Sequence, residues 1–205
     1  MSTGLVIYGD SISGNCLKVK WVADHLGLSY EWRETSVLNG ETRTPEFLAL
    51  NPDGRVPVVV LPGGRVLAES NAIILFLGGN SELAPKDPFQ RAKMMQWLFW
   101  EQYSHEPYIA VRRFHLRYLG KTEDELDPKL IERGNKALAL MENQLGQSRF
   151  IAGDLPTLAD VALVAYTRLA HEGGFDLTPY RAVIRWIKLT EGALGIDAVI
   201  DAVRE

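Results

Sequence analysis

Residues 51–77 constrain the fold of this chain more than any other stretch, because strand, turn and helix signals follow one another there. Residues 58–61 (VVVL) form a short β-branched run, residues 62–64 (PGG) are turn formers, and residues 66–67 (VL) are apolar again. This pattern predicts a β-hairpin. A helix is expected directly after it, with the hydroxyl of Ser70 accepting a hydrogen bond from the first helical amides.

Pro57 stands immediately before the first strand of this hairpin. Proline supplies no ladder donor and holds the preceding Val56 in an extended conformation, so we expect the Val56 amide and carbonyl to be open to an outside partner. The sequence leaves the isomer of the Val56–Pro57 peptide bond open. Taken alone, Pro57 also fits the plain start of an edge strand.

Residues 1–79 alternate strand and helix patterns. Residues 5–8 (LVIY) and 30–33 (YEWR) are strand-like, and between them apolar positions recur at helical spacing before Gly27. Thr44 followed by proline can cap a short helix. The predicted order is β-α-β-α-β-β-α, with a pair of parallel strands and a terminal hairpin. That order is typical of an α/β thioredoxin-like domain.

Strand signals nearly vanish after this domain. We predict a linker over residues 80–88, which are rich in turn formers, and an all-α C-terminal helical domain over residues 89–205. Pro107 is expected to kink or end the first long helix of that domain. Thr157 and Asp160 have the spacing of a capping box at the start of a later helix, which gives Asp160 a structural role.

Composition limits the classes of function. The chain of 205 residues is 46% hydrophobic, enough for two modest domains that each have a core. A net charge of −4 without a lysine or arginine block argues against a nucleic-acid partner. The single cysteine, Cys16, excludes a disulfide framework and fits a reducing compartment. We expect no secretory or membrane segment, a cytoplasmic location, and no metal site, because the four histidines lack metal-ligand spacing.

Several motifs together resemble the cytosolic glutathione transferase family over the whole chain. Residues 8–9 (YG) with residues 13–19 (SGNCLKV) resemble the catalytic loop of its serine-type, theta-like or nu-like bacterial members. Residues 47–58 and 69–73 resemble its glutathione-binding half, and residues 153–160 resemble the capping box of its buried helix. The resemblance implies the glutathione transferase fold, in which the thioredoxin-like domain binds glutathione and the helical domain contributes to the electrophile site.

The resemblance further implies that Ser13 stabilises the thiolate of glutathione without becoming the nucleophile itself. A thiol with a pKa near 8.5 needs ~2.7 kcal/mol to shift by ~2 units. A hydroxyl that donates to a charged acceptor contributes roughly 1.5–3 kcal/mol, and a helix N-terminus roughly 0.3–1. Asn15 can donate a second hydrogen bond, and the sequence does not rank the two residues. Ser11, near the expected electrophile, competes for the catalytic place, although loop capping is the favoured interpretation for it.

Residues 13–16 (SGNC) also have the spacing of a dithiol redox motif whose first cysteine is replaced by serine. A hydroxyl cannot form a mixed disulfide, so thioredoxin-type dithiol exchange is not available to this chain. The favoured interpretation of Cys16 is a small buried residue on the packed face of the first helix.

The remaining glutathione contacts follow from the same resemblance. Glu69 would pair with the γ-glutamyl ammonium, while Ser70 and the helix amides would take the neighbouring carboxylate. The Val56 backbone would bond to the cysteinyl part, and Arg55 or Arg43 would meet the glycine carboxylate. The predicted glutathione-binding residues are therefore Arg43, Arg55, Val56, Pro57, Glu69 and Ser70.

An electrophile would bind between the two domains, against the aromatic first helix of the second one, with Tyr108 and Arg112 as predicted contacts. The resulting hypothesis is a glutathione transferase that joins glutathione to small hydrophobic electrophiles and forms a homodimer. Two alternatives stay open: a glutathione-dependent disulfide or peroxide reductase, and a binding or regulatory protein of the same shape without turnover.

Overall fold

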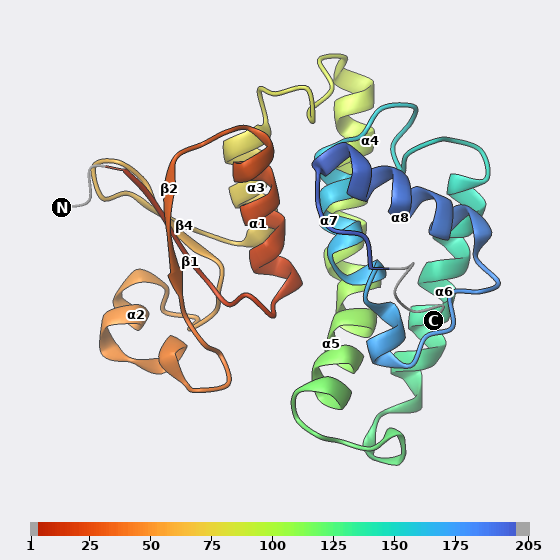
Figure 1. Ribbon diagram of the computed structural model, residues 1–205, viewed down its shortest axis with the longest axis horizontal. Coiled ribbons are helices and arrows are strands. Elements are labelled where there is room, and N and C mark those ends of the chain that lie inside the picture. Colours follow the sequence, from red (N-terminus) through yellow and green to blue (C-terminus); the bar gives the residue numbers. More distant parts are fainter. Residues whose placement is uncertain (1–3, 200–205) are drawn as a thin grey trace. The chain divides into compact units, whose positions relative to one another are not determined.

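The computed structural model describes residues 4–199, and its chain separates between Ser81 and Glu82 into two units (Figure 1). The first unit contains a sheet of four strands in the order β2-β1-β3-β4. Its strands are β1 (Leu5–Gly9), β2 (Tyr30–Glu34), β3 (Val58–Val60) and β4 (Val66–Ala68). Strands β1 and β2 are parallel, while β3 is antiparallel to both β1 and β4.

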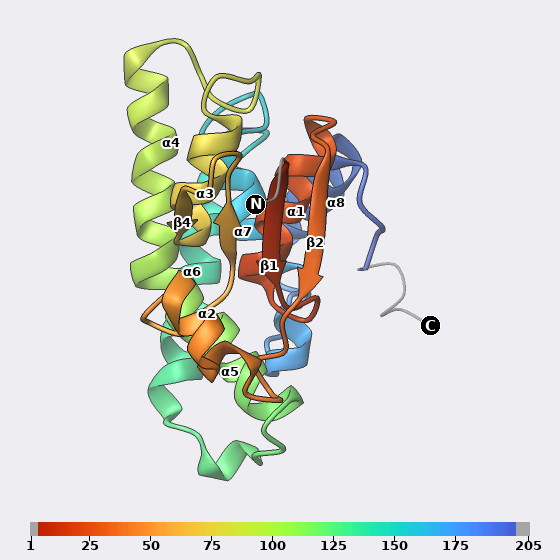
Figure 2. The same ribbon diagram turned by 90° about the vertical axis from the view of Figure 1, so that its left-hand side faces the viewer.

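Three helices cover this sheet. Helices α1 (Gly14–His25) and α3 (Ser70–Gly78) lie on one face, and α2 (Pro45–Leu50) lies on the other (Figures 1 and 2). The parallel β1–β2 pair requires a crossover, which α1 provides. Both the hairpin and the predicted thioredoxin-like order are confirmed.

Apolar side chains of β1 and the two helices on one face form the core of the first unit. Ile7 of β1, Val19 and Val22 of α1, and Ile73 and Ile74 of α3 all have 0% of their surface exposed. Burying a side chain of this size contributes about 1.5–3 kcal/mol. This core therefore fixes α1 and α3 against the sheet.

One predicted helix cap is wrong. Helix α3 begins at Ser70 itself, with Glu69 as its N-cap residue, and the Ser70 hydroxyl donates to Asn15 Oδ1 at 3.1 Å. Glu69 has φ +69°, the only positive φ of a non-glycine residue among residues 4–199. This left-handed turn starts the helix one residue earlier than expected, so the Ser70 side chain lies inside the first turn and reaches α1.

The second unit is all-helical within the described residues, as predicted. Its main helices are α4 (Pro88–Trp100), α5 (Glu106–Arg117), α6 (Pro128–Leu145), α7 (Leu158–Thr167) and α8 (Arg181–Leu194). None of the helices within residues 4–199 combines the length and apolar composition needed to cross a membrane.

A π-helical turn over Glu101–His105 joins α4 to α5. Pro107 lies in the first turn of α5 and lacks the N–H that a continuous helix would need there, so the predicted interruption is confirmed. Glu101 and His105 are both buried, and His105 Nε2 lies 2.9 Å from Thr167 Oγ1 of α7.

Helix α7 is the centre of the second unit, because all ten of its residues are buried. Its predicted capping box is present: Asp160 Oδ2 accepts from the Thr157 amide at 2.8 Å and from the Thr157 hydroxyl at 2.9 Å. Asp160 Oδ1 accepts from the Ile151 amide and from Trp186 Nε1, both at 2.8 Å. Burial raises the pKa of Asp160, and these four hydrogen bonds act in the opposite direction.

Replacing Asp160 by Asn is expected to destabilise the protein by about 3–5 kcal/mol, since an amide NH₂ would face buried donors in this network. The measurement is urea unfolding followed by tryptophan fluorescence. Asp176→Asn is the matched control, because Asp176 also accepts two hydrogen bonds, from the amide and hydroxyl of Thr178, but on the surface. Equal urea midpoints for Asp160→Asn and Asp176→Asn would contradict the structural role assigned to Asp160.

Candidate functional site

The starts of α1 and α3 meet in the first unit. Ser13 is the N-cap residue of α1, Asn15 lies in its first turn, and Ser70 opens α3. Asn15 Oδ1 accepts from Ser70 Oγ at 3.1 Å and from Lys18 Nζ at 2.8 Å. Helix N-termini present unpaired amides and a partial positive charge, so their meeting point favours an anionic ligand.

The Ser13 side chain makes no capping hydrogen bond within the described part of α1. Its backbone is held instead, since the Ser13 amide donates to Asp10 O at 3.0 Å and Ser13 O accepts from the Leu17 amide at 3.0 Å. The Ser13 side chain acts to lower the pKa of the Cys16 thiol, against the larger effect of burial. Ser13 is therefore a half-buried residue that is positioned by its backbone.

The loop before α1 is fixed by two carboxylates. Asp10, almost fully buried, accepts from the Ile12 amide at 3.1 Å and from the Val37 amide at 2.8 Å. Glu34 accepts from the Ser11 amide at 2.8 Å. Sequence reasoning missed Asp10: a turn-forming aspartate indicates the contact two residues ahead, but not the one with Val37, 27 residues away. Ser11 lies exposed on this loop.

The Val56–Pro57 peptide bond is cis, which settles the isomer that the sequence left open. Neither the N–H nor the C=O of Val56 has a hydrogen-bond partner within residues 4–199, as expected. An extended peptide could pair with these two groups in the manner of an added strand.

Both candidate arginines lie beside Asp53. Arg43 Nη1 donates to the Asp53 carbonyl at 3.2 Å, and Arg55 Nε lies 2.9 Å from Asp53 Oδ2. The Arg55 and Asp53 side chains are 78% and 61% exposed, so this ion pair is weak and Arg55 can exchange it for a ligand carboxylate. Gly54 suits this turn because its φ of +64° would strain any residue with a side chain, and a Cβ would lie 3.0 Å from Thr42 O.

Glu69 is exposed at the junction of β4 and α3. Its backbone conformation costs a non-glycine residue of the order of 1–3 kcal/mol, and such residues occur preferentially at functional sites. As the N-cap residue of α3, Glu69 lies directly before Ser70 at the start of that helix.

Tyr108 and Arg112 lie on α5 in the second unit. Arg112 is buried; its Nε donates to Gly173 O at 2.6 Å, and its Nη2 lies 3.2 Å from Glu123 Oε1. These contacts give Arg112 a structural role. The Tyr108 hydroxyl accepts from Arg133 Nη1 at 2.8 Å. Contact of either residue with an electrophile stays a prediction.

Two family models match the chain: "Glutathione S-transferase, N-terminal domain" over residues 12–79 and "Glutathione S-transferase, C-terminal domain" over residues 123–189. A crystal structure of a glutathione S-transferase from Pseudomonas fluorescens Pf-5 is 46% identical, covers 93% of this chain and 95% of its own, and superimposes with a TM-score of 0.89. The chain belongs to the glutathione S-transferase family.

Other members of the glutathione S-transferase family support the assignment. A crystal structure from Xanthobacter autotrophicus Py2 is 41% identical, covers 98% of this chain and 100% of its own, and gives a TM-score of 0.88. "Glutathione S-transferase 2" of Anopheles gambiae is 29% identical over 199 residues, which are 94% of this chain and 93% of that protein. The resemblance and the fold predicted from the sequence are confirmed.

Sequence reasoning did not single out Lys18 in this glutathione S-transferase. Its side chain is fully buried in α1 although it carries an ammonium group. The available signal was a lysine beside the apolar Val19 and three residues after Asn15, the spacing that brings two side chains together on a helix.

Among the described residues, no group of three histidine, cysteine, aspartate or glutamate side chains could hold a metal ion. Cys16 has 0% of its surface exposed, which confirms its predicted packing role. Burial raises its pKa to about 12, and hydrogen bonds with the Asp10 backbone and the Ser13 side chain only partly offset this.

Native protein is therefore expected to resist alkylation of Cys16 by iodoacetamide at pH 8, because the thiolate is the reactive form and the sulfur is inaccessible. Denatured protein should react readily at the same pH. Mass spectrometry after a timed reaction gives the extent of modification. Rapid modification of the folded protein would instead make Cys16 a candidate nucleophile.

Proposed function

We propose that this family member is an enzyme that conjugates reduced glutathione to small hydrophobic electrophiles. The observation that supports this most is the meeting of the α1 and α3 N-termini, where Asn15 bonds to Ser70 and Ser13 is the N-cap residue of α1. The electrophile is proposed by class only, and a reducing, cytoplasmic setting is part of the proposal.

In this mechanism Ser13 and Asn15 donate hydrogen bonds to the sulfur of bound glutathione and hold it as a thiolate. The Ser13 hydroxyl already lowers the pKa of one sulfur, that of Cys16, where burial outweighs it. The thiol pKa of a ligand sulfur that is less deeply buried would be lowered more by the same hydroxyl, because burial would oppose the effect less. The thiolate electron pair then forms the new S–C bond, and the leaving group departs with its own electron pair.

Three further contacts would hold the peptide. The Glu69 carboxylate would pair with the γ-glutamyl ammonium, and the backbone amide of Ser70 with the other free amides at the start of α3 would bind the adjacent carboxylate. The open N–H and C=O of Val56, the residue directly before cis-Pro57, would pair with the cysteinyl backbone. Arg55, with Arg43 as the second choice, would take the glycine carboxylate.

The decisive measurement is the ultraviolet absorbance of the thiolate of bound glutathione as a function of pH, together with calorimetric affinity. The parent protein should hold thiolate at neutral pH. Ser13→Ala should raise the pKa of the bound thiol by about 1–2 units, the equivalent of one hydrogen bond to a charged acceptor, with little change in affinity. Ser11→Ala is the control and should leave the pKa unchanged.

The same titrations distinguish the alternatives. An unchanged pKa in Ser13→Ala would remove Ser13 from the role. Tighter binding of glutathione disulfide than of reduced glutathione would favour the reductase. Absence of binding by either form would leave the regulatory or binding protein as the remaining candidate.

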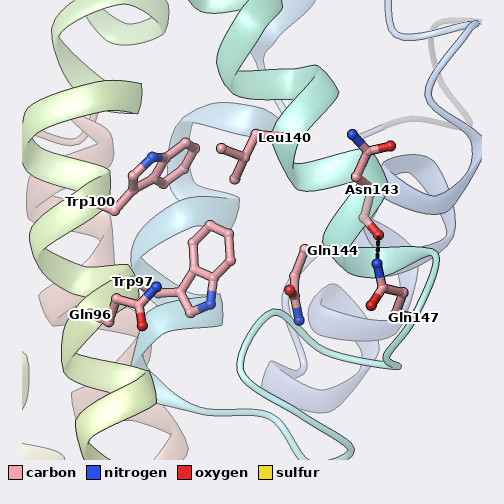
Figure 3. A pocket seen from close by; sticks show the side chains of 7 residues that line it. All are labelled: Gln96, Trp97, Trp100, Leu140, Asn143, Gln144 and Gln147. Atoms are coloured by element: carbon pink, nitrogen blue, oxygen red, sulfur yellow. Dashed lines mark hydrogen bonds between the residues drawn. The ribbon is translucent and has the colours of Figure 1, made fainter.

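We also propose a homodimer, on the basis of two grooves along α4 and α6 that combine aromatic and polar side chains. A groove of about 330 Å³ is lined by three apolar side chains and four amide side chains: Trp97, Trp100 and Leu140 with Gln96, Asn143, Gln144 and Gln147 (Figure 3). A second groove, of about 260 Å³, shares Trp100 and Leu140 and continues to Tyr108. Close by along α4 and the π turn, Phe99 is 68% exposed and Tyr103 is 83% exposed. Exposed apolar patches of this kind mark interaction surfaces.

Sedimentation equilibrium is expected to give twice the chain mass of 22.9 kDa. Leu140→Glu should shift the equilibrium toward monomer, because it places a charge where the two grooves join. Leu155→Glu is the control: Leu155 is 74% exposed, but outside these grooves. A parent protein that sediments as a monomer would refute the dimer.

A further inference from the structure

Lys18 lies beneath the proposed thiolate site. It is on α1, three residues after Asn15, and 0% of its surface is exposed. Its Nζ donates to Asn15 Oδ1 at 2.8 Å. A buried ammonium is costly unless it is hydrogen-bonded, so this contact constrains both side chains.

The Asn15 carboxamide oxygen receives a second donor from the other helix. Ser70 Oγ of α3 donates to the same oxygen at 3.1 Å. An amide oxygen has two lone pairs, and here both are used. Toward a ligand, the Asn15 side chain can therefore offer only its N–H donors, and it selects an acceptor such as a thiolate.

We infer that Lys18 is a positioning residue for the thiolate site, which acts by locking the orientation of the Asn15 amide together with Ser70. This inference rests on the proposed function and adds a residue to it. Without Lys18 the amide oxygen loses one of the two donors that fix its orientation. The amide can then turn its oxygen toward the sulfur, which repels a thiolate instead of stabilising it.

The test compares Lys18→Met with the parent protein by titrating bound reduced glutathione. Methionine retains most of the buried stem and removes the donor. We expect the pKa of the bound thiol to rise by about one unit, a tenfold loss of thiolate preference. Lys20→Met is the control, because the Lys20 side chain is on the same helix but is 41% exposed and paired with Asp24. In this control the pKa of the bound thiol should equal that in the parent protein.

A double-mutant cycle with Asn15→Ala shows whether Lys18 acts through Asn15. If it does, Lys18→Met changes the thiol pKa in the parent and has no further effect in Asn15→Ala. An unchanged thiol pKa in Lys18→Met overturns the inference. So does an equal shift in both backgrounds, since that would be a direct effect of the lysine charge on the sulfur.

If Lys18→Met does not fold, Ser70→Ala tests the other half of the lock in the same cycle. A thiol pKa that rises in the parent but not in Asn15→Ala supports the inference, and equal shifts overturn it. A parent protein that binds glutathione without thiolate at neutral pH refutes the proposed function itself. If the parent does hold thiolate at neutral pH and the variants leave the thiol pKa unchanged, only the inference about Lys18 is refuted.

Discussion

Strand direction is the constraint on which the site of the first unit depends. Strand β3 is antiparallel to β1, and β4 is antiparallel to β3, so β1 and β4 run in the same direction. Each of these two strands is followed by a helix on the same face of the sheet. Both helices therefore begin at the same end of the sheet. The hydrogen bonds of Asn15 then join two N-termini that the topology has already placed together.

Burial distinguishes side chains that hold the fold from those that can meet a ligand. Asp160 is buried with four donors, whereas Glu69 is exposed beside a helix start. The arginines divide in the same way. Arg112 is buried against Gly173, while Arg55 lies on the surface with a weak partner. Residue type alone indicates a charge, and only its surroundings decide which of the two roles that charge can have.

Local signals in the sequence predicted most of the elements, the cap at Thr44 and the capping box of Asp160, because these depend on neighbours within a few residues. The cap at Ser70 was mispredicted because the conformation of Glu69 is set by the fold and not by its own preference. The contact of Asp10 with Val37 and the bond from Ser70 to Asn15 join residues far apart in sequence. The periodicity of the sequence does not predict such long-range pairs. It does not predict the burial of Lys18 either.

The π turn over Glu101–His105 sets the tolerance of its helix to changes in length. Each residue of an α-helix turns the chain by about 100°. Before the turn, Trp97 and Trp100 face the groove along α6, and after it Ile109 and Ala110 pack with Leu138 and Phe175. A π turn holds one residue more than an α turn, so deleting one residue within it would restore the ordinary α-helical pattern and keep both sets in place. A deletion elsewhere in α4 or α5 would rotate one set away from its neighbours. The π turn is therefore the place where this helix can lose a residue without repacking a whole helix face.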